Sequence, residues 1–183
     1  MKTIVLVGCG ATKLQHPAKA KDLYVGQLFR KARAYAEKHG DLWRILSAKY
    51  GLVDPESVIS PYNETVVGKP QKERHNWAVV VRNAISCNLL TWTHENGENW
   101  RCDPVRFVCL AGAPYLSCFE VEGCRIPRFC VIEKPMEGLG IGRRLKFLSQ
   151  GSVGARNDAR NAESVPGVAP GAPLVQGDLF SVA

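Results

Sequence analysis

Residues 43–66, WRILSAKYGLVDPESVISPYNETV, are the stretch on which the prediction of the fold depends. The apolar residues up to Leu46 are typical of a buried strand, whereas Gly51 and Pro55 predict that a long polar loop follows it. In open α/β sheets the ligand site forms from loops that follow the carboxyl ends of strands. We therefore expect the polar side chains of this loop to contribute to a site; they are Ser47, Lys49, Tyr50, Asp54, Tyr62, Asn63, Glu64 and Thr65.

The segments before and after this stretch predict the remaining elements of the same domain. Buried strands are expected at residues 3–7, 105–111 and 129–132, and amphipathic helices at 24–38, 69–90 and 141–149. In the helix at 69–90 Val80 is expected to face the core, and in the helix at 141–149 Arg144 is expected to face outward. Polar, turn-rich segments are expected at 12–23 and 91–104. Because strands alternate with helices, the sequence predicts a single α/β domain, residues 1–150, with a mainly parallel central sheet flanked by helices.

Glycine-containing turns follow the predicted strands at residues 8–13, 112–115 and 135–142. The backbone N–H groups of such turns can hold an anion, although glycine can equally serve only to make a tight turn. The carboxyl ends of parallel strands meet at one edge of a sheet, so these turns should converge with the loop at 47–66. The predicted substrate-binding residues are Cys9, Gly10, Lys13, Ser47, Tyr62, Asn63, Gly112, Tyr115 and Gly138.

The charge of the chain indicates which partners it favours. The 183 residues carry a formal net charge of +7, and only two of the 24 lysines and arginines follow residue 150. A basic domain favours polyanions, nucleic acid first, although a solvated basic surface gives the same composition. The apolar start of the chain is short and predicts a strand rather than a signal peptide. We therefore expect a cytoplasmic protein that binds no membrane.

The seven cysteines predict reduced thiols rather than a disulfide framework. No CxxC pair occurs, and no histidine lies close enough to Cys118, Cys124 and Cys130 to complete a zinc site. Cys109 lies within an apolar run and is expected in the core. We therefore predict no metal site and no cofactor.

Residues 151–183 predict a flexible tail, because glycine, alanine, proline and serine dominate and large apolar residues are scarce. The tail ends in QGDLF at residues 176–180. This resembles the short peptide by which many bacterial repair and replication proteins bind the DNA polymerase sliding clamp, with the glutamine and the final Leu-Phe filling pockets on the clamp. The resemblance implies a partner-binding role for Gln176, Asp178, Leu179 and Phe180.

The body of the chain also resembles known families. YGLVDPESVISPYNETV resembles the corresponding stretch of the YaaA-like family, a peroxide-stress group associated with DNA binding, and a domain of archaeosine synthase, a tRNA-modifying enzyme. With SAKYGLVDP, SPYNET, LAGAPY and PMEGLGIGRRLKFL, residues 3–148 are similar to a phage and bacterial family of uncharacterised function. These resemblances imply an α/β fold and a nucleic-acid or modified-base context.

One functional hypothesis is an enzyme that acts on a nucleobase of DNA or on its N-glycosidic bond, as a glycosylase or a base-modifying enzyme does. Lys49 is the candidate nucleophile or electrostatic stabiliser, and Glu137 or Asp54 the candidate acid/base. Tyr62 and Tyr115 would stack on an extruded base. A surface position for Lys49 and a helix-start role for Glu137 are the alternatives.

Two other classes of function compete with this hypothesis. The first is a non-catalytic DNA-binding module that is recruited to the replication clamp by its tail. The second is an enzyme that processes small nucleotides and does not bind DNA. In the base-directed hypothesis Asn63 would read the edge of the base, and in the module the turn at 8–13 would contact phosphate only.

Overall fold

The computed structural model describes residues 1–95, 105–120 and 130–150, without the side chains of 88–95. The predicted tail with its clamp-binding peptide, and most of the expected insertion at 91–104, lie outside the described residues. The described residues all belong to one compact unit, Met1–Ser152.

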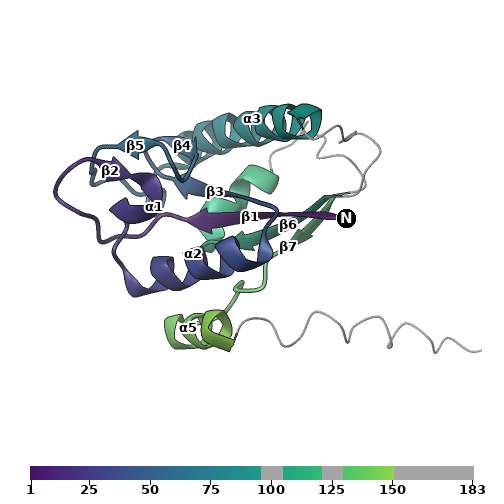
Figure 1. Cartoon of the computed structure of the whole chain (residues 1–183). Coiled ribbons are helices and arrows are strands. Elements are labelled where there is room, and N and C mark those ends of the chain that lie inside the picture. Colours follow the sequence, from purple (N-terminus) through teal and green to yellow (C-terminus); the bar gives the residue numbers. More distant parts are fainter. Residues whose placement is uncertain (96–104, 121–129, 151–183) are drawn as a thin grey trace, which may run out of the picture. The chain divides into compact units, whose positions relative to one another are not determined.

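A five-stranded sheet with the order β4-β3-β1-β6-β7 forms the centre of this unit (Figure 1). The strands are β1 Lys2–Gly8, β3 Leu42–Ser47, β4 Gly51–Val53, β6 Val105–Leu110 and β7 Val131–Glu133. β1 pairs in parallel with β3 and β6, and β6 pairs in parallel with β7. Only β4 runs antiparallel, against β3, among these five strands. The predicted α/β fold with a mainly parallel central sheet is therefore confirmed.

Helices cover both faces of the sheet (Figure 1). α2 (Gln27–His39) and α5 (Ile141–Gln150) pack against each other on one face. α3 (Gln71–Glu95), α4 (Ala113–Leu116) and the 3-10 turn η1 (Ser117–Phe119) cover the other. In α2 the buried residues Phe29, Ala32 and Ala36 recur at helical spacing, so one apolar stripe faces the sheet.

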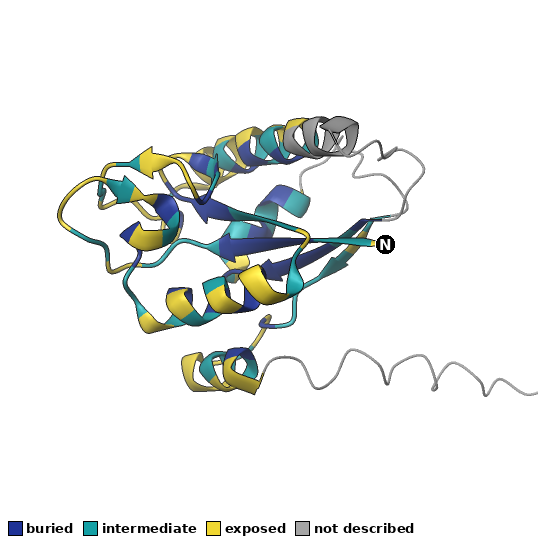
Figure 2. Ribbon diagram, in the orientation of Figure 1, coloured by how far each residue is buried: buried dark blue, intermediate teal, exposed yellow. Residues whose placement is uncertain are grey.

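β1 is buried on both faces, as a central parallel strand should be. Val5 and Val7 belong to the core beneath α2, and Ile4 and Leu6 belong to the core beneath α3. All four side chains are at most 3% exposed, and Figure 2 shows the buried residues concentrated in the central strands. The unbroken apolar run at the start of the chain therefore determines the middle of the sheet.

The segments predicted to be open loops contain short regular elements instead. Gly51, which was expected only to end regular structure, begins β4, and its φ of 71° allows the tight turn that pairs it with Ser47. β2 (Ala18–Lys19) pairs with β5 (Val58–Ile59), and α1 (Ala20–Leu23) follows β2. β2, β4 and β5 have two or three residues and no periodic pattern, so the sequence did not predict them, whereas the equally short β7 overlaps the strand predicted at 129–132.

The helix predicted at 69–90 is longer than expected, because α3 continues to Glu95 and takes up the start of the expected insertion. Its apolar face also differs from the prediction. Ala78, Val81 and Ile85 are buried against the sheet, but Val80, which was expected to face the core, is 62% exposed.

Candidate functional site

The carboxyl ends of β1, β3, β6 and β7 meet at one edge of the sheet, because all four strands are parallel. The pairing of β1 with β3 continues one residue beyond β1, where the N–H of Cys9 donates to the carbonyl of Leu46 at 2.9 Å. This bond brings the turn that follows β1 beside Ser47, the last residue of β3. Two strand ends are thereby joined into one surface.

A pocket of about 400 Å³ opens beside this edge, and we call it the strand-end pocket. It lies between the turn after β1, the start of α2, the end of β6 and the start of α5. Its described lining residues are Gly8, Cys9, Gly10, Ala11, Thr12, Gly26, Gln27, Leu28, Phe29, Ala32, Leu110, Ala111, Gly112, Tyr115, Met136, Ile141, Arg144 and Leu145. The volume is in the range of small-molecule sites, roughly 300–1,000 Å³.

The start of α2 gives this pocket a site for an anion. Residues 26–29 line the pocket, the N-cap Gly26 makes no side-chain capping bond, and the first turn holds no acidic residue. The first N–H groups of a helix lack partners within it, and the positive end of the helix dipole adds to their attraction for anions. The turn after β1 lies against the start of this helix, because a Cβ on Gly10 would be in ordinary van der Waals contact with Phe29 at 3.5 Å.

Arg144 adds a cation to the same pocket, although its place in the sequence predicted that it would face outward. Its Nε donates to the carbonyl of Leu139 at 2.6 Å, which fixes the guanidinium against the turn before α5. Ile141 also lines the pocket and is 63% exposed, so it forms part of the rim rather than the core.

Cys9 and Tyr115 form the polar pair within the pocket. The Cys9 Sγ lies 3.3 Å from the Tyr115 hydroxyl. The Tyr115 ring packs edge-on against Trp77, whose Nε1 donates to the carbonyl of Ser47 at 2.9 Å. Burial, with the nearby thiol, raises the pKa of Tyr115 above its usual value, so its hydroxyl keeps its proton at neutral pH.

A chain of hydroxyl groups lies beside the pocket and is formed by Tyr24, Tyr62 and Ser47. The Tyr62 hydroxyl is 2.9 Å from that of Tyr24 and 2.8 Å from the Ser47 Oγ. Ser47 is fully buried, and its Oγ also accepts the N–H of Tyr50 at 3.0 Å. Burial raises the pKa of Tyr24 to about 12 and raises the pKa of Tyr62 as well. All three hydroxyls therefore stay neutral and hydrogen-bonded.

Lys13 lies at this hydroxyl chain rather than among the residues that line the pocket. Its Nζ is 4.4 Å from the centre of the Tyr62 ring, a cation–π contact, and donates to the carbonyl of Ala11 at 3.2 Å. The structure therefore brings five of the predicted site residues close together: Cys9, Lys13, Ser47, Tyr62 and Tyr115. Of these five, Cys9 and Tyr115 line the strand-end pocket, together with Gly10 and Gly112.

Lys49 does not belong to this group in the structure. Its side chain is 41% exposed, and its Nζ lies 3.8 Å from Glu64 Oε1. A lysine amine acts as a nucleophile when burial or neighbouring cations activate it. An exposed amine beside a carboxylate is instead the arrangement of a surface ion pair.

The two predicted acid/base carboxylates also lie away from the strand-end pocket. Asp54 pairs with Arg44 at 3.2 Å and accepts the N–H of Glu56 at 2.8 Å, so it stabilises the turn after β4. Glu137 is 55% exposed and lies 3.9 Å from Lys134 Nζ. Asn63 is exposed as well. Gly138 is not among the lining residues, and its φ of 69° shapes the turn before α5.

Several residues of the site were not predicted from the sequence, and Tyr24, Phe29, Met136 and Arg144 are the clearest examples. The sequence pattern placed each of them only in a helix, in a turn or on a solvated face. The spacing of residues along the chain does not reveal which helix ends lie beside the carboxyl edge of the sheet. The alternation of strands and helices does contain that information, since every helix that follows a parallel strand starts near its carboxyl end.

The described part of the chain also bears on metal sites, disulfides and membrane-spanning helices. There, no group of three or more histidine, cysteine or acidic side chains is arranged to hold a metal ion. The cysteines of that part, which are 9, 87, 109, 118 and 130, are free thiols. None of its helices has the length and apolar character needed to span a membrane.

The fold is that of an α/β protein with a pocket at the carboxyl edge of a mainly parallel sheet. The chain belongs to the family of unknown function DUF6884, whose model matches residues 4–150. Over 79 residues it is 29% identical to the uncharacterized protein YfjM of Bacillus subtilis (strain 168), a match that covers 40% of this chain and 53% of that protein. The chain thus spans about half the length of this relative. No solved structure matches it.

The buried hydroxyl chain should make the protein less stable in alkali. The folded protein holds the Tyr24 proton up to about pH 12, whereas an unperturbed tyrosine loses it near 10.0, so the free energy of unfolding should fall as pH rises through this window. The loss from Tyr24 is on the order of 2–3 kcal/mol. Urea denaturation between pH 8 and 11.5 should show a smaller decline for Tyr24→Phe than for the wild type, and equal declines would contradict this account.

Proposed function

We propose that this protein binds a nucleotide of DNA in the strand-end pocket and acts on its nucleobase or on its N-glycosidic bond. The observation that supports this most directly is the pairing of two surfaces in one cavity. An uncapped helix start that suits a phosphate faces the same space as an apolar wall that suits a flat ring.

In this proposal each part of the nucleotide contacts a different part of the pocket. The phosphate lies against the first turn of α2 and the turn after β1, where Arg144 supplies a positive charge. The base packs against Leu28, Ile141 and Leu145, apolar lining residues that keep exposed surface. An enzyme that works on a base of DNA either acts on a single strand or takes the base out of the stack, and apolar contacts in the pocket offset part of that cost.

Cys9 and Tyr115 are the candidates for the chemical step. The described lining residues include no carboxylate, so Asp54 and Glu137 have no role at this pocket in the proposal. Tyr115 keeps its proton and can donate a hydrogen bond to the sugar or the base. The thiol beside it is the one nucleophilic sulfur among the described lining residues.

A non-catalytic DNA-binding module is the second candidate. The exposed residues Arg30, Lys38, Arg143 and Lys146 lie on α2 and α5, the helices that begin at the pocket, and such charges attract nucleic acid without any reaction. Free thiols are typical of a reducing compartment. We therefore infer that the protein works in the cytoplasm, whether it is an enzyme or a DNA-binding module.

Removal of the Arg144 charge should weaken nucleotide binding. A charge-assisted hydrogen bond contributes about 1.5–3 kcal/mol, so Arg144→Gln should reduce affinity for a deoxynucleoside monophosphate at least tenfold. Arg143→Gln removes the same charge from an exposed neighbour that does not line the pocket, and should change affinity less than twofold. Isothermal titration calorimetry measures both. Equal effects of the two variants would rule out this pocket as the phosphate site.

The enzyme and the module differ in what the thiol does. If the protein is an enzyme, Cys9→Ala should abolish base release or modification and leave DNA affinity within about twofold of the wild type. Lys49→Ala should keep both properties, because Lys49 lies in an exposed ion pair. The measurement is product analysis by mass spectrometry of a DNA oligonucleotide that is offered both as a single strand and as a duplex. Loss of activity in Lys49→Ala alone would return the catalytic role to that lysine, and the absence of any product would favour the module.

The clamp partner remains a prediction from residues 176–180. In this prediction Leu179 and Phe180 fill pockets on the sliding clamp. Co-purification with the clamp should be lost when both residues are replaced by alanine and should be unchanged in Arg160→Gln, a tail variant outside the peptide. Clamp binding that survives the double replacement would remove this partner.

A further inference from the structure

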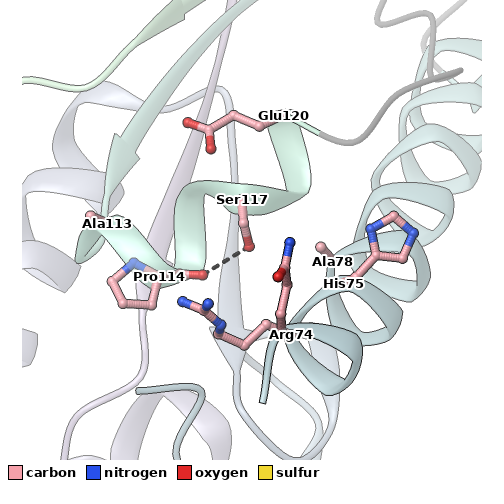
Figure 3. A pocket seen from close by; sticks show the side chains of 8 residues that line it. Arg74, His75, Ala78, Ala113, Pro114, Ser117 and Glu120 are labelled. Atoms are coloured by element: carbon pink, nitrogen blue, oxygen red, sulfur yellow. Dashed lines mark hydrogen bonds between the residues drawn. The ribbon is translucent and has the colours of Figure 1, made fainter. Parts of the chain in front are cut away.

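A second pocket of about 400 Å³ lies on the other face of the sheet, between the first turns of α3 and the α4–η1 segment (Figure 3). We call it the α3 pocket. Its described lining residues are Gln71, Arg74, His75, Ala78, Ala113, Pro114, Ser117 and Glu120. Hydrogen-bond donors from α3 therefore face a wall of alanine and proline.

The two pockets are separated by a single corner of the chain. Gly112 and Tyr115 line the strand-end pocket, whereas Ala113 and Pro114 between them line the α3 pocket. The corner is rigid, because the N–H of Tyr115 donates to the carbonyl of Gly112 at 2.9 Å and Ser117 Oγ donates to the carbonyl of Pro114 at 2.9 Å. A ligand with two linked units can therefore cross this corner and occupy both pockets.

The charge of the α3 pocket favours an anion. Arg74 and His75 are exposed, and no carboxylate of the described residues pairs with either. Glu120 is the one acid among the described lining residues, and it pairs with Lys134 at 3.2 Å. Figure 3 shows the Arg74 side chain extending toward Pro114, with the Glu120 carboxylate at the opposite side of the pocket. A phosphate beside Arg74 would thus be separated from this carboxylate.

We infer that the α3 pocket binds the nucleotide next to the one in the strand-end pocket, so that the ligand is a single strand of DNA rather than a free nucleotide. This inference rests on the proposed function. Arg74 contacts the connecting phosphodiester, and the apolar surface of Ala113 and Pro114 packs against the sugar. A strand that is already single presents its bases without the cost of opening a duplex.

The test compares two ligands and two matched variants by fluorescence anisotropy. The dissociation constant of a labelled single-stranded DNA octanucleotide for the wild type should be at least tenfold lower than the inhibition constant of a deoxynucleoside monophosphate that displaces it. Arg74→Gln should weaken octanucleotide binding about tenfold, and should reduce the slope of log affinity against log salt by about 0.7. The inhibition constant of the monophosphate should be the same for Arg74→Gln as for the wild type. Lys72→Gln, an exposed α3 residue that does not line the pocket, should weaken binding less than threefold.

Alkylation of Cys9, followed by peptide mass mapping, separates failure of this inference from failure of the proposed function. If the octanucleotide protects Cys9 but Arg74→Gln and Lys72→Gln have equal effects, the α3 pocket is refuted and the proposed function stands. If octanucleotide binding depends on Arg74 but leaves Cys9 unprotected, the strand-end pocket is refuted while the anion site on α3 stands. If the monophosphate binds as tightly as the octanucleotide, the two-pocket ligand is refuted.

Discussion

The arrangement of the site depends on the parallel pairing of β1 between β3 and β6. The bond from the Cys9 N–H to the Leu46 carbonyl extends this pairing beyond the strand and fixes where the first turn goes. With β1 buried on both faces, a change in register would move its apolar side chains from one core to the other. The sheet therefore determines both the core and the positions of Cys9 and Ser47.

Two hydrogen-bonded groups of side chains lie at the carboxyl edge of the sheet, and they differ in what they contact. Cys9 and Tyr115 line an open pocket, whereas Tyr24 and Ser47 lie in the interior and bond to other protein atoms. Buried hydroxyls must find partners, because an unsatisfied one costs about 1–3 kcal/mol. The hydroxyl chain is therefore a framework that holds the loop around Tyr62 in place, and the open pair is what a ligand would contact.

The sequence predicted the parts of this structure that have a long or repeated pattern. The apolar run of β1, the stripe of α2 and the turns after parallel strands were enough to predict the fold class and the proximity of Cys9 to Tyr115. The short strand β4 was not predicted, since it depends on the positive φ of Gly51. The position of Arg144 also escaped prediction, because it depends on how α5 is rotated against the sheet. For Lys49 a surface position was the alternative, and the tight turn between β3 and β4 places it there.

The described sheet ends on both sides in a strand of only three residues, β4 on one side and β7 on the other. A long exposed margin would offer a row of unpaired backbone groups to a neighbouring molecule and would promote aggregation. Here the longest strand is enclosed at the centre, and each margin presents few such groups. Edge-to-edge pairing of two molecules through either margin of the described sheet therefore has few backbone groups from which to start.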